Sequence, residues 1–178
     1  MKKSTLYWTL ALAGGALLLR NATRVSIPKG AKAVRPFNLH KYLGQWYEIA
    51  RLDYRWERSL NNVSAFYSQN PDGSVKVENR GYDYKRGRWT ESTGKAKPVF
   101  LEDEARLKVS FFGPFYAGYN VVAIDREYRH ALVFGNDLRY MWILSRDPEI
   151  PDDVKDQYLA YAREIGYDTE KLVWVEHD

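Results

Sequence analysis

Short runs in which hydrophobic and polar residues alternate make up most of the chain after residue 44. Alternation with a period of two is typical of a β-strand with one buried face, because successive side chains point to opposite faces. Turn residues separate the runs, as in Asn70-Pro71-Asp72-Gly73. The pattern predicts eight strands, at residues 44–52, 63–67, 75–79, 88–96, 107–111, 119–125, 129–134 and 140–144.

These predicted strands follow one another through loops, with no helical pattern between them. A meander of this kind closes most economically as an up-and-down barrel, because closure leaves no exposed sheet edge. The predicted fold class is therefore all-β, an eight-stranded antiparallel up-and-down barrel. One C-terminal α-helix is expected to pack on its side.

That helix is predicted between Pro151 and Gly166, since proline is tolerated in a first helical turn and glycine often follows a last one. Apolar residues recur within it at helical spacing, which indicates one face packed against the outside of the barrel. The stripe consists of Val154, Tyr158, Tyr161, Ala162 and Ile165. A short final strand is predicted at residues 172–175.

The N-terminal segment differs in character from the rest. Lys2 and Lys3 precede the uncharged, mostly apolar run Ser4–Leu19, which as a helix would span about 24 Å, short of the ~30 Å hydrocarbon core of a bilayer. A basic start and a short apolar run favour a secretory signal over a stable membrane span. An uncleaved anchor remains the alternative. A buried N-terminal helix is disfavoured, because the run has no amphipathic period.

Two small-x-small sequences offer cleavage sites, Ala11-Leu12-Ala13 inside the apolar run and Ala31-Lys32-Ala33 well beyond it. Neither position is typical, so the sequence leaves open whether the leader is cut. We predict a signal peptide or membrane anchor with a basic linker at residues 1–35, and a barrel domain at residues 36–178.

The net charge of +4 is unevenly distributed. Residues 1–35 hold seven Lys and Arg and no acid, which leaves 20 basic and 23 acidic residues in the remainder. A mildly acidic body argues against a nucleic-acid partner, whereas a basic leader suits an anionic membrane surface. With no cysteine in the chain, disulfides, thiolate catalysis, thiolate metal sites and a lipid-modified cysteine are excluded.

Three short sequences, in order, resemble the signature regions of the lipocalins: Gly44-x-Trp46, the run Asp125-Arg126-Glu127-Tyr128, and Arg146 after the eighth strand. The resemblance extends from about Phe37 to Val175, and the stretch from residue 108 to residue 133 is most similar to bacterial members. It implies a barrel with a C-terminal helix and an arginine stacked over the signature tryptophan. Gly44, Trp46, Asp125 and Arg146 are then structural residues that close one end.

Bacterial lipocalins of this kind are commonly outer-membrane lipoproteins anchored through a cysteine, which this chain lacks. A periplasm-facing place in the cell envelope is expected. The outer membrane follows from analogy alone, and an inner-membrane anchor is the alternative.

Alternation and the resemblance together predict a set of inward-facing side chains that would line a ligand cavity: Ala65, Tyr67, Val75, Val77, Val109, Phe111, Tyr119, Val121, Leu132, Phe134, Tyr140 and Trp142. Small residues at positions 92, 94 and 96 would leave room opposite the aromatic ones. Apolar walls with a few hydroxyls suit a fatty acid or lysophospholipid. A barrel filled by its own side chains is the competing interpretation.

Candidates for catalysis are few. No metal or cofactor is expected, because the three histidines are far apart and none has a metal-ligand spacing. Glu48 or His130 would serve as acid or base if the protein were an enzyme acting on a small hydrophobic substrate. Phe112, Phe115 and Tyr116 are expected either to form an aromatic lip or to pack on a neighbouring loop or on the second subunit of a homodimer.

Overall fold

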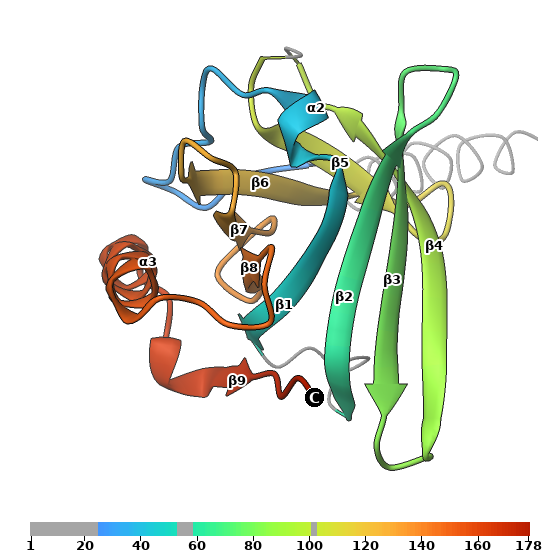
Figure 1. The fold of residues 1–178 in the computed structure, drawn as a ribbon. Coiled ribbons are helices and arrows are strands. Elements are labelled where there is room, and N and C mark those ends of the chain that lie inside the picture. Colours follow the sequence, from blue (N-terminus) through green and yellow to red (C-terminus); the bar gives the residue numbers. More distant parts are fainter. Residues whose placement is uncertain (1–24, 53–58, 101–102) are drawn as a thin grey trace, which may run out of the picture.

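A closed β-barrel with one long helix on its side is the architecture of the computed structural model, which describes residues 25–52, 59–100 and 103–178 (Figure 1). The strands are β1 (Gly44–Leu52), β2 (Leu60–Gln69), β3 (Val75–Asp83), β4 (Arg88–Pro98), β5 (Arg106–Ser110), β6 (Ala117–Ile124), β7 (His130–Phe134), β8 (Met141–Ser145) and β9 (Leu172–Trp174). Consecutive strands from β1 to β8 pair antiparallel, and β1 also pairs with β8, which closes the barrel. The predicted fold class is confirmed.

All eight predicted strands are present, and several are longer than the alternation suggested. β2 begins at Leu60, three residues before its predicted start. Its register with β3 shifts between Asn61 and Ser64, and Asn62 has a φ of 51°. Such a bulge interrupts the alternation of faces, so a strict period of two misses this end of the strand.

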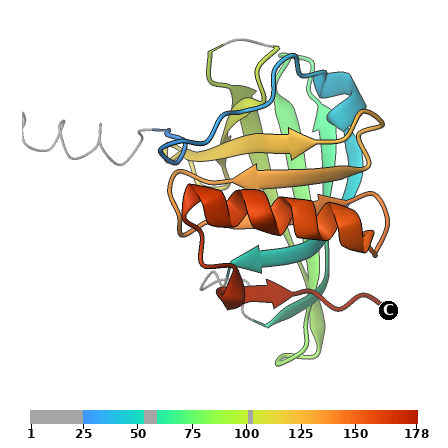
Figure 2. The ribbon, with the colours of Figure 1, turned by 90° about the vertical axis from the view of Figure 1, so that its left-hand side faces the viewer.

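The predicted C-terminal helix is α3 (Asp152–Ile165), which ends at Gly166 with a φ of 106°. A left-handed conformation at this position favours glycine. Figure 2 shows α3 lying across the outside of the barrel strands. Two short helices were not predicted, α2 (Leu39–Tyr42), whose first turn is capped by the Asn38 side chain, and η1 (Thr169–Lys171).

Two hydrophobic clusters lie on opposite faces of the barrel wall. The interior cluster contains Trp46, and the second lies between the wall and α3. Leu132 and Phe134 belong to the cluster under α3, together with Tyr158. The prediction that these two residues of β7 face the interior was therefore wrong.

The register of β7 explains that error. Val133 pairs with Trp142, and both lie in the interior cluster, whereas Leu132 pairs with Ile143 on the α3 side. All five residues of β7 are buried. Because α3 covers the outer face, the strand reads as a continuous apolar run, and its sequence does not show which alternate residues face inward.

The arm before α2 also packs on the barrel. The Val34 N–H donates to the Val121 carbonyl at 2.9 Å and the Val34 carbonyl accepts from Ala105 at 3.0 Å, while Ala31 is 9% exposed within the α3-side cluster. The described part of the predicted linker is thus part of the folded domain. The predicted leader run Ser4–Leu19 lies outside the described residues. Within those described ranges, no helix has the length and apolar character needed to span a membrane.

Candidate functional site

One end of the barrel is closed by Arg146. Its guanidinium lies 3.9 Å from the centre of the Trp46 ring, which is the stack that the resemblance implied. It also donates to the backbone carbonyls of Lys41 and Leu43, both at 2.9 Å, and of Gln45 at 2.5 Å. These carbonyls lie at and just beyond the end of α2, where carbonyls lack helical partners. Burial lowers the pKa of Arg146.

The other two signature residues shape the backbone around this arginine. Gly44 has a φ of 93°, and a Cβ there would lie 3.4 Å from Nη1 of Arg146. The Asp125 carboxylate accepts from the backbone N–H groups of Arg129 at 2.8 Å and of His130 at 2.6 Å, which holds the turn between β6 and β7. The geometry of these residues is that of a closure device.

Above the closed end, three tyrosine hydroxyls meet inside the barrel. The Tyr119 hydroxyl lies 2.6 Å from that of Tyr42 and 2.9 Å from that of Tyr67. Burial raises the pKa of Tyr67 to about 12 and raises the pKa values of Tyr42 and Tyr119 well above their ordinary value. The rings of Tyr42 and Trp46 are 4.8 Å apart. Aromatic side chains thus fill the deep end of the barrel.

An aromatic column continues from this cluster toward the opposite end. The rings of Tyr119 and Trp142 stack with centres 6.5 Å apart, and those of Trp142 and Tyr140 stack at 6.4 Å. Tyr140 directly precedes β8, at the end where the β5–β6 and β7–β8 loops lie, here called the open end. Trp46 is fully buried, whereas the three residues of the column are half-buried. The interior wall is therefore fully buried at Trp46 and half-buried along the column.

Most of the predicted lining residues share the interior cluster with Trp46: Ala65, Tyr67, Val75, Val77, Val109, Phe111, Tyr119, Val121 and Trp142. Tyr140 is joined to them through its stack on Trp142. One detail differs from expectation. A Cβ on Gly94 would lie 2.8 Å from the Phe111 ring, so Phe111 takes the space that the small residues of β4 were expected to leave empty.

A family model for the lipocalin-like domain matches residues 37–177. The chain belongs to the lipocalin family. The outer membrane lipoprotein Blc of Escherichia coli K12 is 51% identical over 167 residues, covering 94% of each chain. The protein of the same name from Vibrio cholerae is 44% identical over 153 residues, which cover 85% of this chain and 90% of the relative. The resemblance to bacterial lipocalins is confirmed.

Solved lipocalin structures agree in fold. Insecticyanin from the tobacco hornworm Manduca sexta matches with a TM-score of 0.71 at 18% identity, over 87% of this chain and 88% of that one. At so low an identity the likeness shows the barrel architecture.

An ion pair in the wall of this lipocalin barrel was not predicted. Arg51 donates from Nη1 to Oε1 of Glu48 at 2.8 Å, with side-chain exposures of 1% and 9%. Residues three apart in a regular strand point to opposite faces, but β1 has a register shift between Glu48 and Ala50. Ala50, which strict alternation along β1 would place on the face of Trp46, lies instead in the α3-side cluster. Burial is the main cause of the raised pKa of Tyr67, the hydrogen bond with Tyr119 lowers this pKa, and the Glu48 charge raises it.

His130 lies on the other face of the wall. Its Nδ1 is 3.2 Å from Oγ of Ser145, and the Ser145 hydroxyl donates to the Glu149 carbonyl at 2.9 Å. An open surface groove of about 430 Å³ next to it is lined by Arg129, His130, Asp147, Glu149, Ile150 and Pro151. Across residues 25–52, 59–100 and 103–178, no group of three or more His, Asp or Glu side chains is arranged to hold a metal ion.

Proposed function

We propose that this protein binds one acyl-chain lipid, a fatty acid or a lysophospholipid, inside the barrel and stores or carries it as a non-catalytic binding protein. The observation that carries this proposal is the half-buried column of Tyr119, Trp142 and Tyr140 between the filled deep end and the open end. An apolar wall with a few polar groups suits an acyl chain. At ~0.8 kcal/mol per methylene, burying about twelve carbons is sufficient for micromolar affinity.

We also propose a location in the bacterial cell envelope, facing the periplasm, with the N-terminal segment in contact with a membrane. Support comes from the basic, apolar leader and from relatives named as outer membrane lipoproteins. Because the chain has no cysteine, a lipid-anchored N-terminus of that type is excluded, and an inner-membrane anchor fits the leader as well as the outer membrane does.

Calorimetric titration of the full chain with oleate and with lysophosphatidylcholine tests the binding proposal. Trp142→Ala is expected to weaken binding about tenfold or more, because it removes a large contact surface from the wall. Trp174→Ala is the matched control, since Trp174 lies on the outer strand β9 and is 46% exposed. Failure of the unsubstituted protein to bind either lipid saturably would overturn the proposal, as would equal losses in the two variants.

The alternative of an enzyme has less support in the geometry. Glu48 lies two residues after Trp46 and before the register shift of β1, so it shares the interior face of that strand. His130 lies on the same face of β7 as Leu132, which packs under α3. The two candidate acid–base residues therefore do not face one space. A Glu48→Gln variant that lost a measurable turnover of bound lipid while keeping its affinity would establish the enzymatic alternative.

A further inference from the structure

We propose that the open end of the barrel docks on an anionic lipid bilayer, with the β5–β6 loop, residues 111–116, inserted among the headgroups. This orientation concerns how the barrel meets a membrane, and it does not depend on which ligand the interior holds. Three independent features lead to it, namely exposed aromatic residues, a difference in charge between the two ends, and the position of the N-terminal arm.

The first feature is apolar exposure. Phe112 is 83% exposed and Phe115 is 52% exposed at the tip of the β5–β6 loop, and Leu138 on the β7–β8 loop is 44% exposed. The two loops are at the same end, because β5 to β8 alternate in direction. Lys108 lies 5.3 Å from the Tyr116 ring. Aromatic residues flanked by a lysine are typical of segments that sit at a membrane interface.

The second feature is the charge of the loops. The described loops of the open end carry three basic residues and one acid, Lys85, Arg86, Arg139 and Asp137. The described loops of the closed end, from β2–β3 to β8–α3, carry seven acids and three basic residues: Asp72, Asp103, Glu104, Asp125, Glu127, Asp147, Glu149, Arg126, Arg129 and Arg146. An anionic surface attracts nearby basic residues by about 1 kcal/mol each and repels acids. It therefore favours approach by the open end.

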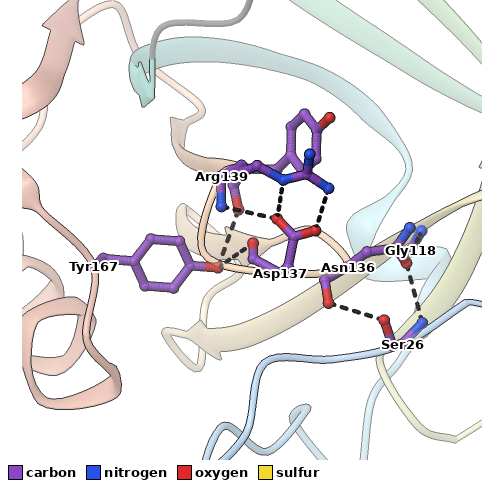
Figure 3. A network of polar contacts seen from close by, with 7 residues as sticks. Ser26, Gly118, Asn136, Asp137, Arg139 and Tyr167 are labelled. Atoms are coloured by element: carbon purple, nitrogen blue, oxygen red, sulfur yellow. Dashed lines mark hydrogen bonds and ion pairs between the residues drawn. The ribbon is translucent and has the colours of Figure 1, made fainter.

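The third feature is the clamp that holds the arm at this end (Figure 3). The Asn136 side-chain oxygen on the β7–β8 loop accepts from the backbone N–H of Ser26 at 3.0 Å and of Gly118 at 2.8 Å. The Asn120 side chain donates to the Ser26 carbonyl at 3.0 Å. A Cβ on Gly118 would lie 2.6 Å from the Asn136 oxygen and 2.7 Å from the Ser26 carbonyl, so glycine is required for this close approach.

The same loop is fixed on its other side. Arg139 pairs with Asp137 at 2.6 Å, and the Tyr167 hydroxyl donates to the Asp137 and Tyr140 carbonyls at 3.2 and 3.1 Å (Figure 3). A rigid β7–β8 loop holds Ser26 at the rim of the barrel. The described chain begins at Val25, next to Ser26 and at the same end as Phe112, and in the sequence it follows an apolar run between basic residues. A leader held at a membrane would place the open end against it.

The absence of cysteine permits a direct test by single-site labelling of the full chain. Phe112→Cys and Phe100→Cys are each labelled with an environment-sensitive fluorophore and mixed with vesicles of phosphatidylglycerol and phosphatidylcholine. Phe100 is the matched control, because it is 72% exposed on the β4–β5 loop at the closed end. We expect a blue shift and quenching by brominated acyl chains at position 112, with neither at position 100. Vesicles of phosphatidylcholine alone are expected to give a smaller shift.

Three outcomes would overturn the proposal. Equal quenching at both positions would mean adsorption without orientation, and no quenching at position 112 would mean that the loop does not reach the bilayer. A shift at position 112 that depends on protein concentration without vesicles would indicate a second copy of the chain as the occupant. Oleate titration of both labelled proteins separates this test from the proposed function, because unchanged affinity is expected whatever the vesicle result.

Discussion

Arg146 joins the adjacent elements α2 and β1 to the β6–β7 turn, which lies more than 70 residues further along the chain. It donates hydrogen bonds to five backbone carbonyls, those of Lys41, Tyr42, Leu43, Gln45 and Tyr128, while its plane lies over Trp46. The planar guanidinium carries five N–H donors, so it can satisfy several backbone carbonyls while its face lies against an aromatic ring. This residue accordingly connects α2, β1 and the β6–β7 turn at the closed end.

Substitution of Arg146 should destabilise the folded protein. Arg146→Ala is expected to lower the free energy of unfolding by about 3 kcal/mol or more, since charge-assisted hydrogen bonds and a cation–π contact are lost together. The free energy of unfolding of Arg146→Lys should lie between those of Arg146→Ala and the unsubstituted protein, because a lysine ammonium cannot reproduce the forked hydrogen bonds of a guanidinium. Urea denaturation measures the change, with the exposed pair member Lys171→Ala as a control expected to leave the midpoint unchanged. A Lys variant as stable as the unsubstituted protein would contradict this account.

At the scale of the element, β7 shows how one strand can serve two clusters. Ala131 and Val133 pack in the interior cluster, while Leu132 and Phe134 pack under α3. The Phe134 ring lies 4.4 Å from that of Tyr167, beyond the end of the helix. The helix thus stabilises the wall from outside, and the opposite face is the one that the proposed ligand would contact.

Because the two faces of the wall pack separately, a substitution on the α3 side should lower stability without changing ligand affinity. Leu132→Ala is expected to cost about 2–5 kcal/mol of stability, because Leu132 is fully buried and the cavity left behind adds to the lost burial. Its affinity for oleate, measured by calorimetry well below the unfolding midpoint, should equal that of the unsubstituted protein. In Trp142→Ala, the affinity for oleate should fall more than the stability does. Comparable losses of affinity in both variants would mean that Leu132 does reach the ligand.

At the scale of the whole molecule, the barrel has a filled, latched end and an aromatic, basic open end. The tyrosine hydroxyls mark the border between the two halves, and they come from three separate elements, α2, β2 and β6. Their environment therefore exists only while the barrel is closed around them.

Stability should for that reason fall at alkaline pH. Burial raises the pKa of Tyr67 from 10.0 to about 12 and raises the pKa values of Tyr42 and Tyr119 well above 10.0. A raised pKa in the folded state gives stability that is complete below pH 10 and lost as the pH rises toward 12 and beyond, because the unfolded chain releases these protons first. Phenolate absorbance and circular dichroism, followed together, should show that the buried tyrosines ionise as the fold is lost.

A pair of variants checks the assignment. Tyr119→Phe removes one buried phenol and should flatten the decline of stability above pH 10, whereas Tyr84→Phe, at a residue 51% exposed, should leave the decline as it is. Ionisation of all tyrosines near pH 10 with the fold intact would contradict the proposed environment.

The amino-acid sequence was sufficient to predict the barrel, its order of strands and the side helix, because alternation of period two and turn residues are local signals. It also identified Trp46 and Arg146 as partners through resemblance, about 100 positions apart. Of the twelve side chains predicted to face inward, nine lie in the interior cluster, since half-buried strands show their inward face in their pattern.

Three other features depend on how distant parts of the chain pack together. β7 is apolar on both faces, so only the position of α3 and the pairing with β8 assign Leu132 and Phe134 to the outside. The bulge in β1 brings Glu48 and Arg51 together although their spacing predicts opposite faces. Ser26 reaches Asn136 across the barrel rim at a separation of 110 residues. Each of these depends on contacts between distant segments, which no local pattern of residues contains.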